Sequence, residues 1–172
     1  NLKDLMGAGV CSFKIEGRMK SQYYVGTVIN AYRTAIDLVQ KGQEIPEYLQ
    51  KELAKTAHRD YTTGFYYGDN NTISYDNNQT AGEYEFMAEV IGYDKAKGGI
   101  WVEQRNRFAI GDCLEILSAT REYLNKNIII EFMENVDGEA VCDAKLVQQK
   151  LFIKTDYPLS KHDILRKKVV KC

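Results

Sequence analysis

Charged and apolar residues alternate along the first strand that the sequence predicts, at residues 10–16. Because successive side chains of a strand point to opposite faces, Lys14, Glu16 and Arg18 would share one face. A buried parallel strand is usually a nearly continuous apolar run. Three charges on one face therefore indicate either a functional site or an exposed edge strand with a ladder of ion pairs.

Apolar residues then recur at three- and four-residue spacing and predict an amphipathic helix over about residues 22–41. Ser21 is placed to cap its first turn, and Gly42 to end it. A second, shorter helix is expected over roughly residues 46–56, with Pro46 in its first turn. The apolar face predicted for the longer helix consists of Tyr24, Val28, Ala31, Tyr32, Ala35, Ile36 and Val39.

The pattern changes to a period of two near Gly82. Before this point, residues 57–82 are rich in Asn, Asp, Gly and Thr, which is typical of turns and loops. After it, short alternating runs are separated by turn signals such as Asp137-Gly138. We therefore predict a small, closed antiparallel β-barrel over residues 83–172, and an α+β fold for the chain.

Composition excludes some classes of protein. The chain has 23 Lys and Arg against 24 Asp and Glu, which argues against a uniformly positive coat for nucleic acid but allows a local basic patch. Four cysteines without a CxxC motif form neither a zinc site nor a secreted disulfide framework, and predict a reduced, cytosolic protein. We expect neither a signal peptide nor a membrane span, because these 172 residues contain no apolar run of about 18 residues.

Three blocks of sequence resemble the C-terminal part of the peptidase U32 family. They are SFKIEGRMKS from Ser12, AYRTAID from Ala31 and RDYTTGF from Arg59. The resemblance is strong over about the first 65 residues and looser beyond them. This family comprises collagenase-like proteases, several of which are associated with RNA hydroxylation.

The resemblance implies a domain organisation. Residues 1–56 would be the C-terminal βα remnant of a large barrel-like catalytic domain, residues 57–82 a connector, and residues 83–172 an accessory domain. The chain opens without Met and reaches its first strand almost at once, so we expect it to be a fragment of a longer protein.

Glu16 and Arg18 are the candidate catalytic residues. In a βα barrel, residues at the C-terminal ends of the strands face the active site. Glu16 could act as a base or hold a substrate hydroxyl, and Arg18 offers a planar fork for a carboxylate or a phosphate. Lys14 would lie one layer deeper, where it pairs with Glu16 or contacts substrate. The alternative is that all three form one structural ion network.

Two further residues are candidates for substrate binding. Lys20 lies at the start of the predicted longer helix, where backbone N–H groups favour anions. Arg59 belongs to the RDYTTGF block and takes its candidacy from the resemblance.

A candidate RNA-binding surface lies around the first hairpins of the predicted barrel. Basic residues interleaved with an aromatic suit single-stranded RNA, by phosphate contact and base stacking. The alternative is a solvated β surface around a core Trp. The surface would contain Lys95, Lys97, Trp101, Arg105 and Arg107, and a basic tail would add Lys161, His162, Arg166, Lys167, Lys168 and Lys171.

No metal site is expected in this chain. Cys113 and Cys142 lie in apolar strand contexts that favour small buried thiols, and Cys11 alone cannot form a four-thiolate site. Since some family members resemble iron–sulfur proteins, the resemblance places any cluster in the N-terminal domain rather than here.

The resemblance leaves two activities open for a cytosolic parent enzyme. One is peptide hydrolysis. The other is hydroxylation of a pyrimidine in tRNA or rRNA, with a small carboxylate as a candidate co-substrate. The second is favoured because the sequence contains no nucleophile–base pair, no HExxH motif and no aspartic dyad.

A third reading is non-enzymatic: an RNA- or protein-docking barrel, or a lid over an active site. We expect the fragment alone to be inert. Its own N-terminal domain would be its partner, and exposed helix surface would favour self-association.

Overall fold

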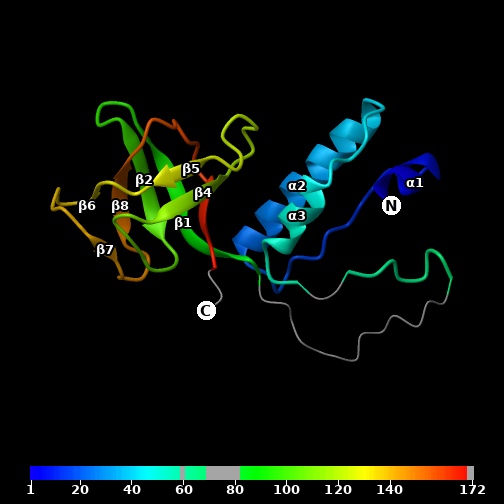
Figure 1. Cartoon of the computed structure of the whole chain (residues 1–172), viewed down its shortest axis with the longest axis horizontal. Helices are drawn as coiled ribbons and strands as arrows, with labels where there is room; N and C mark the ends of the chain where they lie inside the picture. The colour runs from blue at the N-terminus through cyan, green and yellow to red at the C-terminus, as the bar shows by residue number, and fades with distance from the viewer. Residues whose placement is uncertain (59–60, 69–81, 170–172) are drawn as a thin grey trace. The chain divides into compact units, whose positions relative to one another are not determined.

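The chain divides into two compact units, which we call the helical unit (residues 1–83) and the sheet unit (residues 84–172). The computed structural model describes residues 1–58, 61–68 and 82–169 (Figure 1). No helix in these ranges combines the length and the apolar character that a membrane span needs.

The helical unit contains three helices, α1 (Leu2–Gly7), α2 (Gln22–Gln40) and α3 (Tyr48–Ala54). The two longer ones lie side by side in Figure 1 and confirm the two helices predicted over about residues 22–41 and 46–56. The short α1 was not predicted, because one and a half turns are too few for a periodic pattern. A small core of Leu2, Ala31, Ala35 and Leu49 holds the three helices together.

The buried face of α2 differs from the predicted one. Tyr23 is buried and Tyr32 is 38% exposed, so the face is displaced from the apolar pattern. Tyr23 can be buried because its hydroxyl donates a hydrogen bond to the Lys55 carbonyl oxygen, 3.2 Å away. Thr27 and Thr34 are also buried, and a pattern that counts only apolar residues misses them.

The strand predicted at residues 10–16 is wrong, because this segment is extended but pairs with no other strand in the described part of the chain. The remnant of a βα barrel is therefore not confirmed. The predicted alternation itself survives: Phe13 and Ile15 are half-buried, whereas Lys14 and Glu16 are exposed.

All strand pairs in the described part of the sheet unit are antiparallel, and seven strands form one sheet in the order β5-β4-β9-β1-β2-β8-β6. A separate ribbon pairs β3 with β7. The strands are β1 (Tyr84–Asp94), β2 (Gly99–Gln104), β3 (Phe108–Ala109), β4 (Cys113–Leu117), β5 (Asn127–Ile129), β6 (Met133–Asn135), β7 (Asp143–Ala144), β8 (Lys150–Lys154) and β9 (Ile164–Lys168).

This sheet curls into a half-barrel around an apolar core that includes Val90, Ile100, Leu114 and Leu165. Two register shifts in β1, each typical of a bulge, bend the strand and promote the curl. The predicted closed barrel is not confirmed, since no ladder joins the end strands β5 and β6 in the described residues. The α+β class holds.

Candidate functional site

Residues 14–20, here called the cationic segment, lead into the N-terminal end of α2. They carry three basic side chains and one acidic one. Lys14 and Arg18 are exposed, and Lys20 is half-buried. None of the three forms an ion pair with any residue that the structure describes. Their charge is therefore available to an anionic ligand.

Glu16 does not pair with the basic residues beside it. Its Oε1 atom accepts a hydrogen bond from the backbone N–H of Arg18, 2.8 Å away. The Lys20 N–H donates to the Gly17 carbonyl oxygen at 3.0 Å and closes the turn. The predicted pairing of Lys14 with Glu16 is absent from the described structure, because the carboxylate serves this turn instead.

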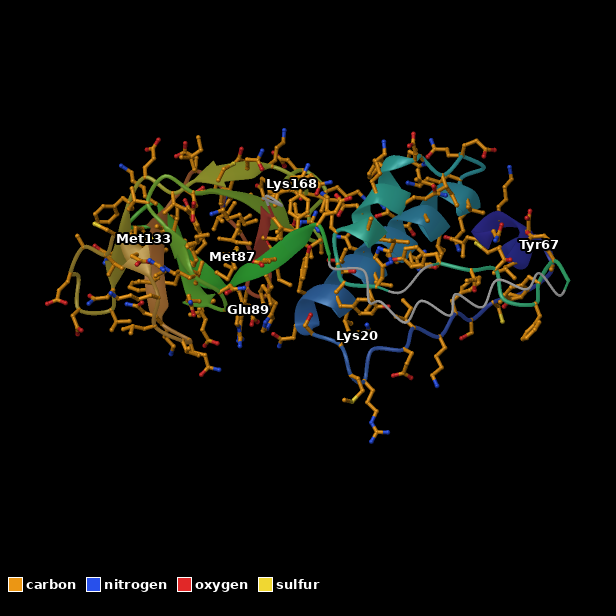
Figure 2. All side chains as sticks on the ribbon, turned by 60° about the horizontal axis from the view of Figure 1, so that its bottom comes forward. Lys20, Tyr67, Met87, Glu89, Met133 and Lys168 are labelled. Carbon is orange, nitrogen blue, oxygen red and sulfur yellow. The ribbon has the colours of Figure 1, made fainter. Side chains whose placement is uncertain are left out.

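Gly17 holds the cationic segment close to α2. A Cβ atom at this position would lie 2.8 Å from the Val25 Cγ2 atom, which is closer than real Cβ contacts. The Ser21 hydroxyl then caps α2 by accepting a hydrogen bond from the Tyr24 N–H at 3.2 Å, as predicted. The Lys20 Nζ atom lies 5.0 Å from the centre of the Tyr24 ring, and Figure 2 shows Lys20 at the start of α2.

Arg59, a predicted substrate-binding residue, lies outside the described residues. Its neighbour His58 stacks on Tyr61, with ring centres 4.4 Å apart. Tyr61 has no predicted role beyond its place in the RDYTTGF block. The only signal available for this pair was its three-residue spacing, which has no meaning outside a helix.

The predicted RNA-binding residues of the sheet unit do not form one patch. Lys97 lies in the turn before β2, and its Nζ atom is 2.5 Å from Glu134 Oε1. The same Nζ lies 5.4 Å from the Trp101 ring centre and 5.5 Å from that of Phe152. The positive charge of Lys97 is thus balanced by Glu134, and the ammonium group lies near two aromatic rings. Lys95, in the same turn, is exposed.

Arg105 and Arg107 lie beyond the other end of β2, on the order of 20 Å away for a strand of this length. The Arg105 Nη2 atom is 2.7 Å from Glu89 Oε2 and 3.0 Å from Glu103 Oε1. Arg107 binds both oxygens of Asp143, at 3.0 and 2.8 Å. Pairing with Arg107 lowers the pKa of Asp143.

The predicted basic tail is part of the sheet. Arg166 on β9 is fully buried, so the prediction of a surface position is wrong. Its Nε atom donates to Glu115 Oε1 at 2.8 Å, its Nη2 atom donates to Asn125 Oδ1 at 2.7 Å, and its Cζ atom lies 5.4 Å from the Tyr84 ring centre. A terminal strand between β1 and β4 has the burial of a central strand, which its position at the end of the sequence conceals.

Two neighbours of Arg166 in this tail are also paired. The Lys167 Nζ atom is 2.7 Å from Asp112 Oδ1, and the His162 Nδ1 atom is 2.8 Å from Glu89 Oε1. Hydrogen bonds from His162 and Arg105 lower the pKa of Glu89, against the opposing effect of its partial burial. Lys171 lies outside the described residues.

The three cysteines in the described part of the chain do not supply a cluster site. Cys11, Cys113 and Cys142 are free thiols and all are exposed, so the predicted burial of Cys113 and Cys142 is wrong. Cys113 lies on the outer face of β4, opposite Ile129 of β5, whereas Leu114 points into the core. Among the described residues no three acidic, His or Cys side chains are arranged to hold a metal ion. These residues therefore do not fit an iron–sulfur cluster.

Two family models match the chain. Residues 1–76 match peptidase family U32, and residues 82–166 match the C-terminal domain of peptidase family U32. The chain is 33% identical to tRNA hydroxylation protein P1 of Bacillus subtilis, in an alignment that covers 97% of this chain and 40% of that protein.

Two other relatives carry different names. Identity is 35% with tRNA hydroxylation protein P of Escherichia coli, over 82% of this chain and 31% of that protein. It is 36% with an uncharacterized protease of Methanocaldococcus jannaschii, over 63% of this chain and 28% of that protein. The chain thus spans less than half the length of each of these relatives.

Proposed function

Because the chain belongs to the peptidase U32 family, we propose that it is the C-terminal part of a protein that acts in tRNA hydroxylation. In this proposal the helical unit contacts an anionic ligand and the sheet unit is an accessory domain. The names of the Bacillus subtilis and Escherichia coli relatives support the reaction class.

The observation that carries the proposal is the unpaired charge of the cationic segment. Lys14, Arg18 and Lys20 have no carboxylate partner among the described residues. A guanidinium fork can bind a carboxylate or a phosphate through two parallel hydrogen bonds. An RNA substrate supplies phosphates, and a small organic acid as co-substrate supplies a carboxylate.

Glu16 supports this contact by ordering the turn. Its carboxylate caps the Arg18 N–H, so it fixes the backbone from which the Arg18 side chain projects. Glu16 then acts as a positioning residue rather than as the general base.

Hydroxylation replaces a C–H bond by a C–O bond and needs an oxidant or hydroxyl donor. The functional groups of the described residues do not supply one, so their part is binding and positioning. The chemistry would belong to the remainder of the protein, where an iron–sulfur cluster is a candidate cofactor.

Nucleoside mass spectrometry of total tRNA tests this function directly. Cells that lack the gene encoding this chain should lose a hydroxylated pyrimidine, and the intact gene should restore it. A gene carrying Arg18→Ala should restore less of it, while Arg33→Ala serves as the matched control, because Arg33 is already paired with Asp37. An unchanged nucleoside profile would contradict the proposal and return the weight to peptide hydrolysis.

A further inference from the structure

Tyr61 presents an exposed aromatic ring that is held at its hydroxyl and on one ring face. Its hydroxyl donates a hydrogen bond to the Leu53 carbonyl oxygen at 3.1 Å, and one ring face stacks on His58 at an interplanar angle of 18°. The residue as a whole is nevertheless 60% exposed. Burial around the hydroxyl raises the pKa of Tyr61 to about 12. The hydroxyl end is therefore anchored, and the ring remains open to solvent.

Tyr61 is anchored beside the N-terminal end of α2, the helix that carries Tyr24 and Tyr32. The Tyr61 hydroxyl donates to the Leu53 carbonyl oxygen and the Tyr23 hydroxyl donates to the Lys55 carbonyl oxygen, two residues further along the chain. Tyr24 and Tyr32 lie about two helical turns apart on one side of α2. Tyr24 is half-buried and Tyr32 is 38% exposed. We call Tyr24, Tyr32 and Tyr61 the tyrosine face. Lys20, over the Tyr24 ring, joins the tyrosine face to the cationic segment.

We propose that the tyrosine face is a docking surface for unpaired bases of RNA, with the phosphates held by the cationic segment beside it. The inference rests on the proposed function and adds the residues that hold the RNA. Every base has an aromatic face that can stack on a tyrosine ring, and unpaired strands expose those faces whereas duplexes hide them.

Charge complementarity selects this occupant over a neutral protein surface. The cationic segment brings three positive charges and one carboxylate, and the carboxylate is engaged by a backbone N–H. An apolar partner would leave these charges unmatched, and their desolvation would oppose docking. A phosphate backbone that follows the segment would match them.

Fluorescence anisotropy of the 172-residue chain tests the proposal. The probe is a fluorescein-labelled oligouridylate of about 12 nucleotides, a length within the range that one small domain binds. We expect it to bind more tightly than an RNA duplex of equal length. Loss of one stacked base contact in Tyr61→Leu should weaken the affinity about 5- to 150-fold.

Two controls separate stacking from other effects. Tyr61→Phe keeps the ring and should bind within about twofold of the original chain. Tyr67→Leu removes another exposed tyrosine of the same stretch, 57% exposed and bonded through its hydroxyl to Asp4. Figure 2 shows Tyr67 beside α1, well away from Lys20, so this variant should bind normally. If Tyr61→Leu fails to fold by circular dichroism, Tyr32→Leu replaces it and should also weaken binding.

Three results would overturn the inference: no binding of the oligouridylate at low salt, equal binding of strand and duplex, or normal binding by the leucine variants of the tyrosine face. The nucleoside assay distinguishes this failure from failure of the function. A hydroxylated pyrimidine that depends on the gene, together with normal binding by Tyr61→Leu, would leave the function intact and reject only the tyrosine face.

Discussion

The cationic segment of the helical unit and the basic residues Lys97 and Arg105 at the two ends of β2 differ in what surrounds them. In the helical unit, Lys14, Arg18 and Lys20 lie on the cationic segment without a carboxylate partner among the described residues. In the sheet unit, Lys97 and Arg105 lie within 2.5 to 2.7 Å of carboxylates. The number of basic residues in a sequence therefore says little about ligand binding until their carboxylate partners in the fold are known.

Sheet geometry explains the compensation. Residues that are distant in sequence lie on adjacent strands or turns, so a basic side chain on one strand meets an acidic side chain on the next. Arg107 and Asp143 meet at the β3–β7 ribbon, and Arg166 and Glu115 are direct partners on β9 and β4. The cationic segment has no neighbouring strand, so no such acid faces it.

The largest effect is expected at the buried pair. Arg166→Leu leaves the Glu115 carboxylate with little solvent and without its guanidinium, and should lower the free energy of unfolding by about 3–5 kcal/mol. Urea denaturation followed by circular dichroism measures this loss. The double variant Arg166→Met/Glu115→Leu should recover much of it, because no isolated charge remains. A loss below about 1 kcal/mol in the single variant would show that the pair does not hold the sheet together.

The second effect concerns affinity rather than stability. Arg18→Ala/Lys20→Ala should weaken binding of the oligouridylate and reduce the slope of log affinity against log salt by about 1.4, since each phosphate contact with a single strand contributes about 0.7. Its unfolding free energy should fall by less than about 1 kcal/mol, through loss of the contact between Lys20 and the Tyr24 ring. The matched control, Arg105→Ala/Arg107→Ala, removes the same number of charges from the sheet unit. Equal slopes for the two double variants would break the comparison.

A smaller effect is expected at Lys97. Lys97→Met keeps an aliphatic side chain on the Trp101 and Phe152 rings but removes the positive charge that pairs with Glu134. It should lower the unfolding free energy by about 1 kcal/mol. Denaturation and anisotropy on the same sample check both properties. Weaker RNA binding with unchanged stability would instead place Lys97 in a ligand surface.

The smallest effect is a pH dependence at Glu89. Because its pKa in the folded chain lies below the ordinary value of 4.5, its pairing stabilises the fold above that value. The contribution disappears as the pH falls through the lowered pKa. The melting temperature of Glu89→Gln should therefore be lower than that of the original chain near about pH 7. The two melting temperatures should converge at acidic pH. A difference that persists at low pH would assign the effect to packing.

Much of the fold follows from periodicity. Three- and four-residue spacing locates α2, Pro46 marks the start of the region that contains α3, and Ser21 is recognisable as the cap of α2. The strand at residues 10–16 fails because alternation reports which side chains face inward, but a strand also needs a partner. The closed barrel fails for a related reason, since the pairing of end strands depends on curvature that the pattern does not encode.

The candidate site was only partly predictable. Lys14, Arg18 and Lys20 are visible as charges near a helix start, but their lack of partners depends on long-range packing. Arg166 shows the converse, because a basic residue in a basic run proved to be fully buried. Tyr61 could not be recognised, since its stacking on His58 and its bond to the Leu53 carbonyl oxygen depend on a chain conformation that the sequence pattern does not encode.

Crosslinking is the most direct test of the claim that RNA binds the helical unit rather than the sheet unit. The 172-residue chain would be irradiated with an oligouridylate containing 4-thiouridine, and the crosslinked peptides identified by mass spectrometry. We expect crosslinks in peptides that contain Lys20, Tyr24 or Tyr61. Crosslinks confined to peptides that contain Lys97, Trp101 or Arg105 would contradict the account.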